Sequence, residues 1–108
     1  MITTEAFAGK PKQQRRRKMA SECAFEIGKN YLIRTVTQFH TGKLKAIYDQ
    51  ELVLSDAAWI TDTGRFFNFL DKGVAAEIEP FVDDVIISRA AIVDATEFRH
   101  ELPRNQKG

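Results

Sequence analysis

The fold is decided by residues 30–60, which read NYLIRTVTQFHTGKLKAIYDQELVLSDAAWI. This stretch is dense in β-branched and aromatic side chains, which favour strands over helices. A turn or sharp bend is expected at Thr41-Gly42, and a tight turn at Asp49-Gln50. The predicted strands are residues 31–40, 43–48 and 51–60. Three consecutive strands joined by short polar turns predict a meander.

A short helix is predicted after the meander, inside an insertion at residues 61–84. Asp62 or Thr63 can cap a helix that begins near residue 64. The helix should end at Lys72, because Gly73 stands where a C-cap glycine belongs. One face of this helix is apolar and should pack on the sheet, since three large side chains follow helical spacing: Phe66, Phe69 and Leu70.

Two more strands are predicted beyond the insertion. They occupy residues 85–89 and 92–98, with a brief turn at Ala90-Ala91 between them. Residues 99–108 are polar, and we expect them to form a loose, flexible tail.

The N-terminal part predicts a basic leader followed by a helix. Pro11 suits a first helical turn, and residues 13–25 contain no helix breaker. Gly28 would end that helix. The chain should therefore divide into three parts: leader and helix at 1–28, a β domain at 29–98 and a tail at 99–108.

A single, mainly β domain is the expected fold class. The chain has 108 residues, which leaves little room for two complete cores. A sheet this short buries both faces most readily by curling into a barrel. Its edge strands then need partners, and assembly of several copies would cover them.

Composition excludes several classes of protein. No apolar run approaches the roughly 20 residues that span a bilayer, and the first residues lack the regions of a signal peptide. Cys23 is the single cysteine, so a disulfide framework and a cysteine-built zinc site are excluded. We expect a cytoplasmic protein with no membrane partner.

The net charge of +1 conceals an uneven distribution. Residues 1–29 carry seven positive and three negative side chains, a net charge of +4. Residues 30–98 carry six positive and eleven negative side chains, a net charge of −5, and residues 99–108 carry +2. The β domain should repel a phosphate backbone except where positive charge is focused, whereas the ends could attract one.

Two motifs in this chain resemble the signatures of the Sm-like family, which comprises the Sm, LSm and Hfq proteins. The first motif contains Gly42-x-Leu44, the acidic turn at Asp49, and the run LVLSDA at residues 52–57. The second is VIISRAAIV at residues 85–93. The resemblance covers about residues 30–98 and is closest in character to Sm-like proteins of phage or bacterial origin, because the Tyr-Lys-His motif of Hfq is absent.

The resemblance implies a small, strongly bent five-stranded barrel that assembles into a homo-oligomeric ring through its last two strands. It also implies a site for single-stranded RNA. Arg89 matches the family arginine, and Tyr48 lies in the turn that matches the base-contacting loop, where aromatic and guanidinium planes can stack on bases. Glu51 falls where the family has a base-reading asparagine, and Ala90 replaces a glycine.

Each candidate site also has a plainer interpretation. The run Arg15, Arg16, Arg17 and Lys18 could bind nucleic acid or another anionic surface, or it could be a solvated tail. Tyr48 could instead pack in the barrel wall. Arg89 could instead pair with one of three carboxylates: Asp49, Glu51 or Asp94.

Catalysis has little support in the sequence. His40 and His100 are isolated, no serine has a Gly-x-Ser-x-Gly context, and no glycine-rich phosphate loop occurs. The acidic residues between 77 and 84 lack metal-loop spacing. We expect a non-enzymatic, ring-forming RNA-binding protein without cofactor or metal. The alternative is a structural or protein-interaction ring of phage or prophage origin that recognises no RNA.

Overall fold

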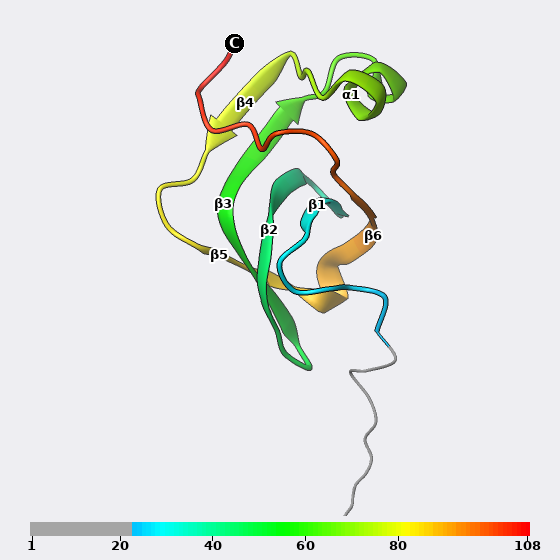
Figure 1. Cartoon of the computed structure of the whole chain (residues 1–108), viewed down its shortest axis with the longest axis vertical. Helices are drawn as coiled ribbons and strands as arrows, with labels where there is room; N and C mark the ends of the chain where they lie inside the picture. The colour runs from blue at the N-terminus through cyan, green and yellow to red at the C-terminus, as the bar shows by residue number, and fades with distance from the viewer. Residues whose placement is uncertain (1–22) are drawn as a thin grey trace, which may run out of the picture.

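The computed structural model describes residues 23–108 as one antiparallel sheet with a short helix beside it (Figure 1). This confirms the mainly β fold class. No helix within the described range is both long and apolar enough to cross a membrane. The elements are β1 (Asn30–Thr35), β2 (Phe39–Ile47), β3 (Glu51–Asp62), α1 (Phe66–Lys72), β4 (Glu77–Pro80), β5 (Val85–Ser88), the 3-10 helix η3 (Arg89–Ala91) and β6 (Ile92–Glu97).

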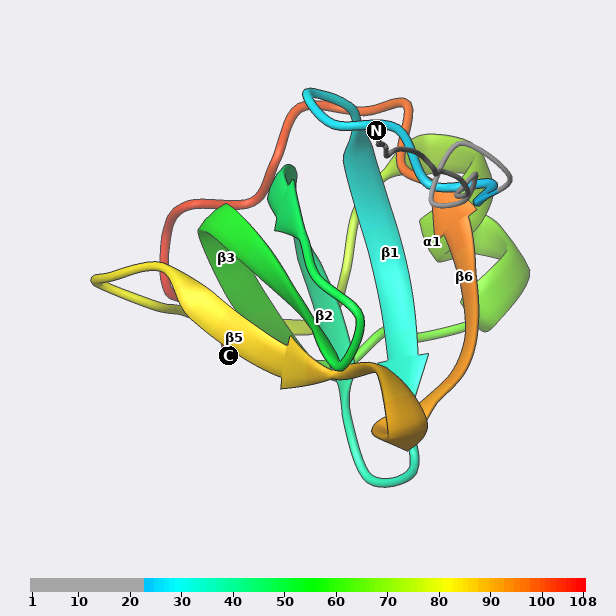
Figure 2. The same ribbon diagram turned by 90° about the horizontal axis from the view of Figure 1, so that it is seen from below.

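Among the described residues the sheet has six strands, one more than expected, because the insertion supplies β4. The strand order is β4-β3-β2-β1-β6, and β5 also pairs with β3. β4 and β5 share one edge of β3: β5 pairs with its first four residues and β4 with its last part. Within residues 23–108, β5 and β6 do not pair with each other, so the expected barrel stays open (Figure 2).

Alternation along the strands separates the apolar side chains into two clusters. In β1, Tyr31 and Ile33 point to one face of the sheet and Leu32 to the other. The first cluster is Tyr31, Ile33, Leu44, Leu52, Leu54, Ala57 and Ile87. The second cluster is Leu32, Ala58, Ile60, Phe69, Ala75, Ile78 and Phe98. Both faces of the sheet are therefore covered in a single short chain.

One of the two predicted meander turns is confirmed and the other is wrong. At Asp49-Gln50 the chain reverses tightly, and the Tyr48 N–H donates to the Glu51 carbonyl at 2.8 Å. At Thr41-Gly42 β2 continues as a strand, and the first turn lies earlier, at residues 36–38. The Thr35 side chain explains this position, because its hydroxyl accepts a hydrogen bond from the Gln38 N–H at 3.1 Å.

Gly42 has a packing role within β2. A Cβ atom there would lie 3.0 Å from Leu54 Cβ and 3.2 Å from Ala57 Cβ. The pairing of β2 with β3 shifts register beside it, and Asp56 adopts a left-handed φ of 51°. The glycine and the bulge together let two strands approach closely where β3 bends.

The inserted helix is confirmed, with a different start from the one predicted. α1 begins after Arg65, and no side chain caps it; the Asp62 carboxylate instead accepts a hydrogen bond from the Gly64 N–H at 2.8 Å. Gly73 ends the helix with a left-handed φ of 76°, and its N–H donates to the Phe69 carbonyl. Phe69 is fully buried against the sheet, as the apolar face predicted.

The two ends of the β domain differ from expectation. Residues 23–28 form turns and no helix, while the rest of the helix predicted from Pro11 lies outside the described residues. The tail expected to be loose runs back along the sheet. Ile78 and Lys107 exchange two backbone hydrogen bonds, and the Arg104 guanidinium donates to the carbonyls of Ala57 and Phe81.

Candidate nucleic-acid interface

The fold brings together the three residues of the β domain that the Sm-like resemblance predicts to lie at an RNA site. Tyr48 and Glu51 flank the β2–β3 turn, and Arg89 follows β5 directly. The Arg89 guanidinium donates to the Tyr48 carbonyl at 2.9 Å, and the Arg89 N–H donates to the Gln50 carbonyl at 2.9 Å. Two segments about forty residues apart in sequence therefore form a single loop cluster, defined here as Tyr48–Glu51 with Arg89.

The strand register explains why this loop cluster forms. β5 pairs with β3 so that Ser88 lies opposite Glu51. The chain leaves β5 one residue later, which places Arg89 beside the turn. A shift of one residue in this pairing would turn the side chains to the other face of the sheet.

The Tyr48 side chain is exposed over 57% of its surface and does not pack in the sheet wall. Arg89 is half-buried, and its guanidinium bonds to a carbonyl. Within residues 23–108 it forms no ion pair. Asp94, one of the carboxylates considered for Arg89, instead pairs with Arg34, whose Nη2 lies 2.6 Å from Asp94 Oδ2. The hydrogen bond from Arg34 lowers the pKa of Asp94 below its usual value.

The chain enters the described region beside this loop cluster. Cys23 Sγ lies 3.9 Å from Arg89 Nη2, a long contact for a sulfur acceptor. The predicted basic residues Arg15, Arg16, Arg17 and Lys18 lie outside the described residues. In the sequence, Lys18 stands five residues before Cys23.

A group of three aromatic rings lies elsewhere in the sheet and includes the buried His40, for which the sequence indicated no partner. The Trp59 indole N–H donates to His40 Nε2 at 3.1 Å, and Phe81 stacks on the His40 ring with centroids 6.0 Å apart. Burial lowers the pKa of His40, because the charged ring would lose its hydration. This histidine is a neutral hydrogen-bond acceptor that orients Trp59.

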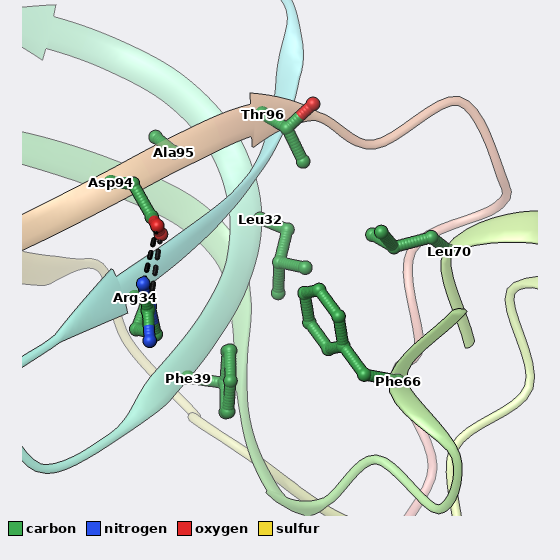
Figure 3. A pocket seen from close by; sticks show the side chains of 8 residues that line it. All are labelled: Leu32, Arg34, Phe39, Phe66, Leu70, Asp94, Ala95 and Thr96. Atoms are coloured by element: carbon green, nitrogen blue, oxygen red, sulfur yellow. Dashed lines mark hydrogen bonds and ion pairs between the residues drawn. The ribbon is translucent and has the colours of Figure 1, made fainter. Parts of the chain in front are cut away.

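An open apolar groove lies between α1 and the face of β6, as Figure 3 shows. It has a volume of about 250 Å³, and the Arg34–Asp94 ion pair borders it. Its apolar walls are Leu32, Phe39, Phe66 and Leu70. Sequence reasoning assigned Phe66 and Leu70 to packing on the sheet, because helical spacing alone does not reveal that one end of the apolar face stays open.

No group of three or more potential metal-binding side chains occurs within the described part of the chain. Comparison with known sequences adds no relative: no protein-family model and no curated protein matches this chain.

Proposed function

We propose that this chain is a non-enzymatic, cytoplasmic subunit of an Sm-like homo-oligomeric ring that binds single-stranded RNA. The contact between Arg89 and the carbonyl of Tyr48 supports it most, because it joins the two loops that carry RNA contacts in the Sm-like family. The pairing of the last strand, β6, with the first, β1, also supports the proposal, because it brings the two ends of the chain's β domain into one bent sheet.

Ring formation is supported by the two open edges of the sheet. β5 pairs only with β3 and β6 only with β1 among residues 23–108, so each has one unpaired edge. Pairing β5 of one copy with β6 of the next would cover both edges, and repetition of this contact closes a ring. A mass measurement in solution tests it: a monomer at micromolar concentration would contradict the ring.

RNA binding is supported by the exposed Tyr48 ring and by the basic run at residues 15–18, which precedes Cys23 by a few positions in the sequence. A base stacked on an aromatic side chain contributes about 1–3 kcal/mol. The four basic residues would add contacts to phosphates that are independent of sequence. Residues 30–98, with their net charge of −5, would contribute little to phosphate binding. The affinity for RNA should therefore depend on Tyr48 and on the basic run.

A titration of fluorescent oligo-U and oligo-A tests RNA binding. Tyr48→Ala should weaken binding by about 5-fold to 150-fold, which corresponds to one lost stacking contact. Phe67→Ala is the matched control, because Phe67 is also an exposed aromatic residue but lies on α1. Tyr48 is a sharper target than Arg89, since the Arg89 guanidinium also holds the turn in place.

Deletion of residues 1–18 tests the basic run separately. Each phosphate contact to single-stranded nucleic acid contributes about 0.7 to the slope of log K against log salt, and the deletion removes six basic side chains, so it should lower the magnitude of the slope by up to about 4. Undetectable binding of both oligonucleotides at low salt would contradict the RNA proposal. Binding unchanged by both the deletion and Tyr48→Ala would place the RNA elsewhere.

A structural ring without RNA recognition is the second candidate, and one observation favours it. Glu51 stands beside the turn where the family has an asparagine, and a carboxylate repels phosphate and offers no donor. Glu51→Asn separates the two candidates. The substitution should create or strengthen RNA binding if the rest of the loop cluster can bind RNA. In a purely structural ring it should leave RNA binding undetectable.

A further inference from the structure

The groove between α1 and β6 (the α1 groove) borders the open edge of the sheet. β6 contributes Asp94 and Thr96 to its lining, and all residues of β6 after Ile92 are exposed. In Figure 3 the side chains of Phe66 and Leu70 point from α1 toward Leu32, and β6 lies on the opposite side of the groove. Any chain that pairs with β6 would therefore lie beside this groove.

Strand pairing alone is too small to hold two copies together. β5 has four residues, and a strand of four residues is about 13 Å long and about 10 Å across with its side chains. Such a strip covers about 130 Å² on each face, whereas a stable interface buries about 800 Å² per partner. An interface built on β5 and β6 must extend onto the surfaces that flank these strands.

The β5 side of the molecule carries uncovered apolar side chains. Val82, just before β5, is exposed over 95% of its surface, and Ile86 within β5 over 65%. An open apolar groove at one edge and exposed apolar side chains at the other edge are complementary in a head-to-tail contact. The groove beside β6 and the exposed side chains near β5 lie at different edges of the sheet, so they can meet only between different copies.

We propose that the α1 groove is part of the interface between copies and receives Val82 and Ile86 from the β5 side of the neighbour. The inserted helix then has a definite role, because it forms one wall of the groove and extends an interface too small without it. This inference rests on the proposed ring, and it concerns residues that the ring proposal itself does not require.

Charged substitutions on the two surfaces test the inference. Phe66→Glu and Ile86→Glu should each raise the dissociation constant of the assembly by about tenfold or more, because a carboxylate would be buried in an apolar contact. Phe67→Glu is the matched control: Phe67 adjoins Phe66 on α1, is 69% exposed and does not line the groove. Native mass spectrometry reports the assembly, and thermal melting checks that each variant is folded.

Mixing the two defective variants tests which surfaces meet. Phe66→Glu keeps an intact β5 side, and Ile86→Glu keeps an intact α1 groove. An equimolar mixture should form a one-to-one heterodimer that cannot extend, as expected for a head-to-tail interface.

The outcomes distinguish this inference from the ring itself. A monomeric wild type would overturn the ring and the inference together. A wild-type ring that Phe66→Glu leaves intact would overturn only the inference. If Phe66→Glu disrupts the ring but the mixture forms no heterodimer, the groove has a different occupant and the assignment of Val82 and Ile86 is wrong.

Discussion

Replacement of Gly42 by alanine should destabilise the sheet by overpacking. The added Cβ would lie 3.0 Å from Leu54 Cβ, 3.1 Å from Leu54 Cδ1 and 3.2 Å from Ala57 Cβ. Carbon atoms pack best at about 3.5–4.0 Å, so each of these contacts is several tenths of an ångström too short. Leu54 and Ala57 are fully buried, and a Cβ atom moves only with its backbone, so β3 itself must shift.

The expected cost of Gly42→Ala is about 1–3 kcal/mol in the free energy of unfolding. For a domain of this size, 2 kcal/mol corresponds to a fall in Tm of about 8–16 °C. Urea denaturation followed by tryptophan fluorescence measures the change, because Trp59 lies in the neighbouring strand β3. The slope against urea should stay constant if the native fold is retained.

A double-mutant cycle identifies the cause of this destabilisation. Ala57→Gly removes one of the atoms that the new Cβ would meet, so the cost of Gly42→Ala should be smaller in that background by about 0.5 kcal/mol or more. A cost below about 0.5 kcal/mol for Gly42→Ala alone would refute the close approach of β2 and β3. Strictly additive effects would refute the assigned contact with Ala57.

Two further predictions concern His40 and Asp56. The pKa of His40 is lowered in the folded state, so the unfolded chain binds its proton first and stability should fall as pH decreases below 6.5. Urea titrations between pH 8 and pH 5 should show this loss in the wild type and a flatter profile in His40→Gln. Asp56 holds a φ of 51°, so Asp56→Gly should stabilise the protein by about 0.5–1 kcal/mol and Asp56→Val should destabilise it. Equal melting temperatures for these two Asp56 variants would contradict the left-handed bulge.

Local patterns in the sequence predicted most of the secondary structure. Gly73 ends α1 as expected, because a glycine adopts a left-handed φ without a Cβ penalty. Asp49-Gln50 forms the predicted turn, since both residues suit a tight polar reversal between two apolar strands. The expected turn at Gly42 was wrong because a glycine in a strand can equally mark a close approach of two backbones.

The residue types of the candidate site could be predicted from the sequence, but their arrangement in space could not. Tyr48 and Arg89 were both identified from motifs, but whether each side chain packs, forms an ion pair or stays exposed depended on the fold. Packing exposes the Tyr48 ring, and the register between β3 and β5 sets the Arg89 guanidinium against a carbonyl rather than a carboxylate. The hydrogen bond from Trp59 to His40 left no sequence signal, because it joins two strands across the sheet.

The sequence by itself determined the mainly β character, the meander, the inserted helix and the separation of a basic N-terminal segment from an acidic body. These properties depend on spacing and charge along a few neighbouring residues. Only the tertiary structure decided that the sheet stays open, that the tail runs back over it, and that α1 leaves a groove beside β6. Such features depend on contacts between segments that are distant in sequence. Strand register and the surfaces that packing leaves uncovered determine the free energies of those contacts.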